Sequence, residues 1–250
     1  MTDLPLKDRI ALVVGASRGI GYESALALAR AGAHVIATAR TVGGLEELDD
    51  AIFAATGKHA TLIPFDLVDG GAIDRLGGAI YERFGRLDIW VQAAATMGAS
   101  GLTPVSHADP RIWAKVEKTN LSAVYRLIRS LEPLLKASDA GRVVHLTTSV
   151  AAAPRAFWGM YAATKAGAEA LLKCWADEIE SMPIRVSIVD PGRMRTAMRA
   201  QAYPGEDPED VVHPSAIGPL IVELSRGDLQ PPPEVSFKDW SQGPGVAALI

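Results

Sequence analysis

The chain has almost no cysteine and no zinc-binding motif. Cys174 is the single cysteine among 250 residues. A lone cysteine excludes an internal disulfide, makes a cysteine-based zinc site improbable, and fits a reducing compartment. The sequence has no H-E-x-x-H motif, and its histidines are scattered. The histidines are His34, His59, His107, His145 and His213. We therefore expect no metal site.

Charge of one sign and long apolar runs are also missing. The 25 basic residues stand against 29 acidic ones, for a net charge of −4. Without a basic stripe, neither nucleic acid nor an anionic membrane surface is an expected partner. No run approaches the ~20 apolar residues that span a bilayer, and the first ten residues lack the apolar core of a signal peptide. We expect a cytoplasmic protein that acts on a small molecule.

Apolar strands that alternate with helices organise the chain. Short apolar runs predict strands at residues 10–14, 34–39, 60–66, 87–95, 141–148 and 184–192, with helical patterns between them. One long helix is expected from Trp113 to Leu135. This alternation predicts a parallel sheet covered on both faces. With 48% hydrophobic residues and no linker, the whole chain, 1–250, is expected to form one doubly wound Rossmann-type α/β domain with six to seven strands.

Two regions differ in character from this series. Residues 202–214, "AYPGEDPEDVVHP", are acidic and rich in proline, so we expect the segment 193–215 to form a lid over a substrate pocket. The tail, 230–250, has three consecutive prolines and little periodicity. It is expected to pack on the surface or to dock a partner.

A glycine loop follows the first predicted strand. In "GASRGIG", Gly15, Gly19 and Gly21 stand between a strand and a helix. Glycines in this context allow a tight turn and bring backbone N–H groups and a helix N-terminus close to a pyrophosphate. The alternative is that they only let the helix and the sheet pack together.

The second predicted strand ends without a carboxylate. An NAD site commonly places Asp or Glu there, about 20 residues beyond the glycines, to bind the ribose 2′-hydroxyl. Here Ala39 stands in that place, Arg40 follows it, and Arg18 lies in the glycine loop. Guanidinium groups bind a 2′-phosphate by charge-assisted hydrogen bonds. The sequence therefore favours NADP(H), with NAD(H) as the weaker alternative, unless both arginines are only solvated.

Tyr161 and Lys165 lie four residues apart in "GMYAATKAG". This spacing places both side chains on one face of a helix. They form either an ordinary amphipathic pair or a catalytic one, in which the nearby ammonium lowers the pKa of the phenol.

These motifs together resemble the short-chain dehydrogenase/reductase family. Its G-x-x-x-G-x-G loop and its Y-x-x-x-K pair match here in the family's order, from Ile10 to beyond Thr196. The segment 195–208 also resembles a bacterial subgroup of unassigned substrate. The resemblance implies a homodimer or homotetramer. It implies these cofactor-binding residues: Gly15, Ser17, Arg18, Gly19, Ile20, Gly21, Arg40, Asp66, Leu67, Ala94, Tyr161, Lys165, Pro191, Gly192 and Thr196.

The resemblance also implies the chemistry and its residues. Tyr161 would be the acid in the reduction of a carbonyl and the base in the oxidation of an alcohol. Lys165 would hold the nicotinamide ribose and favour tyrosinate. Ser149 would hydrogen-bond the substrate oxygen, with Thr148 as its close competitor. Asn120 would position a water that links Lys165 to solvent.

The sequence departs from the family at "QAAA", residues 92–95, where the family usually carries "NNAG". This change removes hydrogen-bonding side chains beside the cofactor path. It motivates an alternative function, a non-catalytic protein that binds NADP(H) for regulation or assembly. For the enzyme, an apolar pocket is suggested by Met97, Phe157, Trp158, Met194, Met198 and Tyr203, whereas Arg155 or Arg193 could recognise an anionic group.

Overall fold

A parallel sheet of seven strands runs through the computed structural model, which describes residues 4–243. The strand order is β3-β2-β1-β4-β5-β6-β7, and every pair is parallel. The predicted doubly wound Rossmann-type fold is confirmed, with the larger of the two expected strand numbers. The strands are β1 (Ile10–Val14), β2 (His34–Ala39), β3 (Thr61–Pro64), β4 (Ile89–Gln92), β5 (Gly141–Leu146), β6 (Ile184–Asp190) and β7 (Glu234–Ser236).

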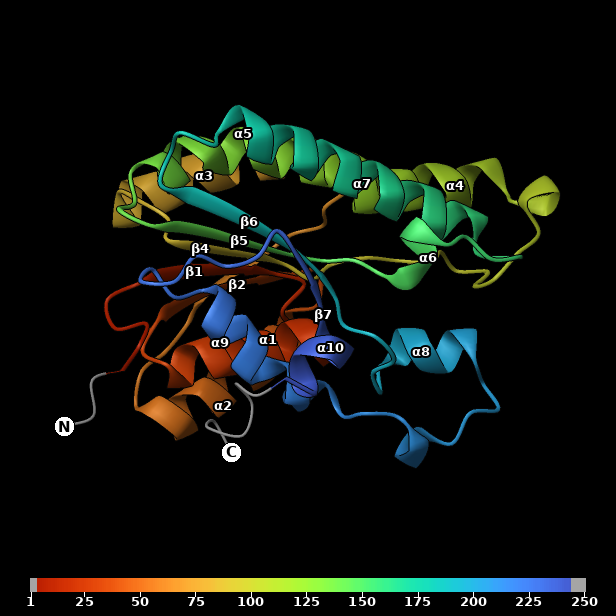
Figure 1. Cartoon of the computed structure of the whole chain (residues 1–250), viewed down its shortest axis with the longest axis horizontal. Coiled ribbons are helices and arrows are strands. Elements are labelled where there is room, and N and C mark those ends of the chain that lie inside the picture. Colours follow the sequence, from red (N-terminus) through yellow and green to blue (C-terminus); the bar gives the residue numbers. More distant parts are fainter. Residues whose placement is uncertain (1–3, 244–250) are drawn as a thin grey trace.

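Helices cover both faces of the sheet (Figure 1). One face carries α1 (Gly19–Arg30), α2 (Val42–Thr56), α9 (Gly218–Leu224) and α10 (Phe237–Ser241). The other carries α3 (Gly70–Phe84), α5 (Ala123–Lys136) and α7 (Gly159–Glu178). Three short helices lie toward the carboxyl ends of the strands: α4 (Pro110–Glu117), α6 (Ser149–Ala152) and α8 (Ala197–Ala202).

The pattern of β1 explains why the sheet is buried on both sides. Successive side chains of a strand point to opposite faces. Ala11 and Val13 accordingly belong to the core under α1, α2 and α9, whereas Leu12 and Val14 belong to the core under α3, α5 and α7. All four are essentially inaccessible to solvent, so this strand is apolar at successive positions rather than at alternate ones.

The order of the strands leaves a crevice beside β1. From β1 the chain builds outward to β2 and β3, and then returns to β4 on the other side of β1. The connections on the two sides therefore diverge at the carboxyl ends of β1 and β4. In open α/β sheets, ligands bind at this switch point.

The helix expected from Trp113 to Leu135 is present as one helical stretch, but it is not a regular α-helix throughout. A π-helical turn, Lys118–Ser122, separates α4 from α5. Such turns insert an extra residue into an α-helix and are frequent at functional sites. The periodic apolar pattern does not reveal the insertion, because both flanking helices keep their buried faces.

The tail is more regular than its sequence suggests. Residues 234–236 add β7 beside β6, and the Trp240 indole of α10 donates to Glu223 at 3.0 Å. As far as residue 243 the tail thus extends the sheet and contacts α9, and residues 244–250 lie outside the described part.

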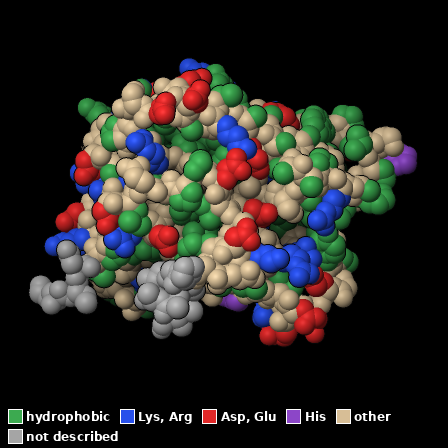
Figure 2. Space-filling view, viewed as in Figure 1, with side chains coloured by type: hydrophobic (Ala, Val, Ile, Leu, Met, Phe, Trp, Pro, Cys, Tyr) green, Lys and Arg blue, Asp and Glu red, His purple; other side chains and the backbone are tan. Residues whose placement is uncertain are grey.

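Within residues 4–243, none of the helices combines the length and apolarity that a bilayer crossing needs. Figure 2 shows acidic and basic side chains interspersed over the face in view.

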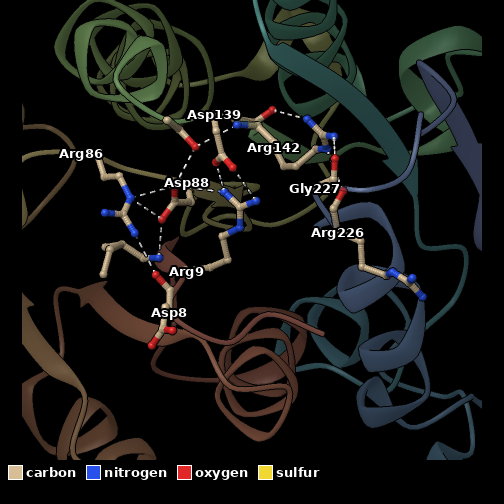
Figure 3. Close-up of polar contacts among 12 residues, drawn as sticks. Asp8, Arg9, Arg86, Asp88, Asp139, Arg142, Arg226 and Gly227 are labelled. Carbon is tan, nitrogen blue, oxygen red and sulfur yellow. Dashed lines mark hydrogen bonds and ion pairs between the residues drawn. The ribbon is translucent and has the colours of Figure 1, made fainter. Parts of the chain in front are cut away.

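A buried carboxylate holds the amino ends of three strands together (Figure 3). Asp88, directly before β4, is 0% exposed. It accepts hydrogen bonds from the Ile10 amide of β1 at 2.8 Å, from Arg86 Nε at 3.1 Å and from Ser138 Oγ at 2.6 Å. Arg9 Nη1 lies 3.4 Å away. This cluster lies at the amino ends of the central strands, and the crevice lies at their carboxyl ends.

We expect Asp88→Ala to lower the free energy of unfolding by about 3 kcal/mol, because it leaves buried donors and cations without their acceptor. Asp139→Ala is the matched control. Its carboxylate pairs with the same Arg9, but its side chain is 79% exposed, so the loss should stay below about 1 kcal/mol. Urea denaturation of both variants measures the difference, and equal losses would contradict this account of Asp88.

Candidate functional site

A cavity of about 450 Å³ opens at the carboxyl ends of the strands. We call it the crevice cavity. Its volume lies within the range of cofactor and ligand pockets. Most residues predicted to bind the cofactor line it: Gly15, Ser17, Arg18, Gly19, Ile20, Gly21, Arg40, Asp66, Leu67, Ala94, Tyr161, Pro191 and Thr196.

The glycine loop packs backbone against backbone, and no side chain would fit there. Gly15 has φ +90°, and a Cβ on it would lie 2.7 Å from the Ala94 amide nitrogen. A Cβ on Gly21 would lie 2.1 Å from the Gly15 carbonyl oxygen. The loop leads directly into α1, whose N-cap, Arg18, makes no side-chain cap. The first N–H groups of α1 therefore suit a phosphate.

Two arginines line the crevice cavity. Arg18 lies in the glycine loop, and Arg40 follows β2. Arg40 Nη1 lies 3.9 Å from Asp66 Oδ2, with 55% of the arginine side chain exposed. Asp66 therefore holds this guanidinium loosely and leaves most of its donors open. The cavity thus offers a glycine loop and two guanidinium groups to an anionic ligand.

The "QAAA" segment forms one wall of the crevice cavity. Ala93, Ala94 and Ala95 all line it. Gln92 Nε2 donates to the Ala94 carbonyl at 3.2 Å, so this side chain braces the turn after β4. Gln92 Oε1 is buried without a partner. The departure thus replaces polar side chains on the wall by methyl groups, while the backbone stays in contact with Gly15.

Lys165 lies below the crevice cavity with 2% of its surface exposed. Its ammonium donates to the Leu146 carbonyl and lies 3.1 Å from His145 Nε2. Burial lowers the pKa of Lys165 to about 8. Burial and the neighbouring ammonium lower the pKa of His145 well below its usual value, so His145 is neutral and can accept from Lys165.

Tyr161 is 9% exposed and lines the crevice cavity. Burial raises the pKa of its phenol to about 12, and Asp190 adds to this rise. The prediction that Lys165 lowers this pKa is therefore wrong for this structure. The physical reason is that the ammonium is directed to the end of β5, while the phenol is surrounded by apolar groups.

Asn120 braces the site from the π-helical turn. Its Oδ1 accepts from the Thr96 amide at 2.8 Å. Its Nδ2 donates to the Thr96 carbonyl at 2.8 Å and to Thr164 Oγ1 at 3.1 Å. The side chain thus ties the loop after β4 to α7. Its expected role with water stays a prediction.

A second cavity of about 120 Å³ adjoins Tyr161, and we call it the side cavity. Thr148 lines it and caps α6, accepting from the Val150 amide at 3.5 Å. Gly192 also lines it. Ser149 is exposed and lines neither of these two cavities. The geometry therefore favours Thr148, the competitor, over Ser149 as the hydroxyl near Tyr161.

Sequence reasoning did not single out Phe65 and Thr147. Each directly follows an observed strand, and both line the crevice cavity. They fall at the carboxyl ends of the predicted strands 60–66 and 141–148, where ligands bind in an open α/β sheet.

The fold and the cavities define a class. A glycine loop before a helix N-terminus, at the switch point of a doubly wound sheet, is the arrangement of a dinucleotide-binding oxidoreductase. The sequence model described as short chain dehydrogenase matches residues 9–207. This chain belongs to the short-chain dehydrogenase/reductase family and is an oxidoreductase of it.

Several relatives of this chain come from bacteria. The uncharacterized oxidoreductase YciK of Escherichia coli K12 is 38% identical over 225 residues, which cover 89% of this chain and 88% of that protein. A short chain dehydrogenase of Shigella flexneri 2a, crystallised with NADP, superposes with a TM-score of 0.90 at 36% identity, covering 95% of this chain and 100% of that one. Another, from Escherichia coli CFT073 with NADPH, has a TM-score of 0.89 at 37% identity, covering 95% and 99%.

The lowered pKa of Lys165 predicts how stability depends on pH. Between its folded value of about 8 and the ordinary 10.5, the unfolded chain binds a proton that the folded chain does not. The free energy of unfolding therefore rises with pH in this window. Lys165→Met lacks the group, so wild type should gain up to about 3 kcal/mol relative to it from neutral pH to pH 10.5.

Denaturation of both proteins at three pH values across this window measures that gain. The other titrating groups are common to both proteins and cancel in the difference. A difference that stays constant with pH would contradict the assignment.

Proposed function

We propose that this protein is an NADP(H)-dependent oxidoreductase that interconverts a carbonyl and an alcohol, with Tyr161 as general acid and base. One observation carries the proposal. Tyr161 lines both the crevice cavity and the side cavity, so its phenol lies where a cofactor in one and a substrate in the other would meet.

The crevice cavity would hold the cofactor. The N–H groups at the start of α1 bind the pyrophosphate, and Arg18 and Arg40 bind the 2′-phosphate by charge-assisted hydrogen bonds. Thr196, which caps α8, lies across the loop, with its Cγ2 3.3 Å from where a Cβ on Gly19 would lie. When bound, the nicotinamide supplies the hydride or takes it up. The relatives crystallised with NADP and NADPH support this choice.

Tyr161 moves the proton. With a pKa of about 12, the phenol is protonated at neutral pH and so has a proton to donate to a carbonyl oxygen. Lys165 lies one helical turn along α7, with its ammonium on the Leu146 carbonyl and beside His145. Hydrogen bonding to the nicotinamide ribose is its proposed role.

Thr148 would hold the substrate oxygen. Its hydroxyl is fixed by the cap of α6 and lines the side cavity with Tyr161. A hydrogen bond from this position orients the carbonyl and stabilises the charge that develops on its oxygen. A protein that only bound dinucleotide would need neither this hydroxyl nor the phenol.

Tyr161→Phe tests the proposal. It removes the proton donor, so turnover of carbonyl substrates should fall at least about 10²-fold. Cofactor binding should be retained, because the glycine loop and both arginines are untouched. Fluorescence titrations of wild type and variant should both show tighter binding of NADPH than of NADH. An active variant would contradict the role of Tyr161, and equal affinities would contradict the choice of NADP(H).

Thr148 and Ser149 form a matched pair for mutation. Thr148→Ala should lower kcat about 10²-fold, the effect of losing a donor to the developing oxyanion. Ser149→Ala should stay near the wild-type rate. Steady-state kinetics of the reduction of one carbonyl compound compares the two variants. A loss of kcat confined to Ser149→Ala would reverse the assignment.

A further inference from the structure

The wall of the side cavity is largely apolar. Ile20, Trp158, Met194, Met198 and Ala202 contribute to it. Three of the residues expected to form an apolar pocket line this cavity, namely Trp158, Met194 and Met198. Met97 is buried in the neighbouring cluster, and Phe157 is 55% exposed.

One cation lines this cavity, Arg199 of α8. A lone arginine beside a catalytic tyrosine would ordinarily indicate an anionic substrate. Here its donors already have a partner within the chain. Arg199 Nε lies 2.6 Å from Glu206 Oε2, and Nη2 lies 2.5 Å from Oε1, a bidentate pair.

The same guanidinium is also covered on one face. Arg199 Cζ lies 3.8 Å from the centroid of the Tyr203 ring, which is the geometry of a cation–π contact. The Arg199 and Glu206 side chains are only 19% and 21% exposed. Hydrogen bonding to Arg199 lowers the pKa of Glu206, so the carboxylate remains charged at neutral pH and the pair is neutral overall.

The other arginines near this cavity do not change its charge. Arg195 forms a second bidentate pair in the same segment, with Nη1 2.7 Å and Nη2 3.2 Å from the Glu209 carboxylate. Arg155 and Arg193, considered above as anion ligands, are exposed and line neither cavity. At the α8 end of the molecule, Figure 2 shows basic and acidic side chains next to one another.

Aromatic rings extend from the catalytic tyrosine. The Trp158 ring centroid lies 5.8 Å from that of Tyr161 and 6.1 Å from that of Tyr203. These spacings are within the range of favourable aromatic contacts. A flat apolar group beside Tyr161 would meet rings and methionine side chains rather than charges.

We propose that the side cavity selects an uncharged carbonyl compound with a compact apolar or aromatic group, and that Glu206 sets this selectivity by neutralising Arg199. The proposal rests on the oxidoreductase function proposed above. It also gives the segment 193–215 a role, since two ion pairs within it, Arg199–Glu206 and Arg195–Glu209, fold the residues after α8 back onto α8 and onto the turn before it.

Two ketones of similar shape test the proposal. 1-Phenyl-1,2-propanedione is neutral, and phenylglyoxylate carries a carboxylate in place of the acetyl group. Each takes up one hydride and one proton to give the hydroxy product, with one NADPH oxidised. For wild type, kcat/KM for the dione should exceed that for phenylglyoxylate at least about tenfold, the worth of one hydrogen bond to a charged group.

Glu206→Gln should shift this ratio at least about tenfold toward phenylglyoxylate, because it frees a guanidinium facing the cavity. Adding Arg199→Met should abolish the shift. Glu209→Gln is the matched control: it frees Arg195, which lines the crevice cavity, and should leave the ratio unchanged. Circular dichroism and NADPH titration establish that each variant is folded and binds the cofactor.

Each outcome has one meaning. A wild type that prefers phenylglyoxylate, or a Glu206→Gln variant with the wild-type ratio, overturns the proposal. NADPH binding with no turnover of either ketone, while other carbonyl compounds are reduced, also overturns it but leaves the proposed function intact. Failure to bind NADPH, or to reduce any carbonyl compound of a broad panel, overturns the proposed function itself and the substrate proposal with it.

Discussion

The site depends on the close contact between the glycine loop and the turn after β4. Gly15 and Gly21 leave no room for a Cβ, so β1, α1 and β4 approach one another at their backbones. This contact directs the first N–H groups of α1 into the crevice between the two halves of the sheet. The alanines at 93–95 fit the same constraint, since they form the facing wall with little bulk. The unusual "QAAA" sequence is therefore compatible with a glycine loop that binds a dinucleotide.

A second constraint is the burial of charge beneath the crevice. Lys165 lies in the interior with a carbonyl and a neutral imidazole as partners, and this burial disfavours the charged form. Its cost to stability fits a residue retained for chemistry rather than for packing. The buried charge at the amino ends of the strands is better satisfied, because Asp88 accepts hydrogen bonds there from several donors and ties strands together. The amino ends of the strands thus stabilise the fold, whereas the carboxyl ends carry a buried cation at a cost to stability.

The fold was largely predictable from the sequence because its signals are local. The limits of β1 and β2 match the predicted strands, and the glycine loop lines the crevice cavity as its motif indicates. What could not be predicted depends on three-dimensional neighbours. The direction of the Tyr161 pKa follows from burial, which the spacing to Lys165 does not reveal. The preference for Thr148 over Ser149 depends on which hydroxyl the start of α6 turns inward, and the pairing of Arg199 with Glu206 depends on how the segment after α8 folds back.

The central claim is that Tyr161, between the two cavities, delivers a proton to a carbonyl that receives hydride from NADPH. Turnover with NADPH deuterated in turn at each C4 position tests it most directly. The account predicts that deuterium from one of the two positions appears on the carbinol carbon of the product and slows turnover. It also predicts that D₂O as solvent slows turnover, because Tyr161 transfers a proton. Bound NADPH that never transfers its label to any carbonyl compound would contradict the claim.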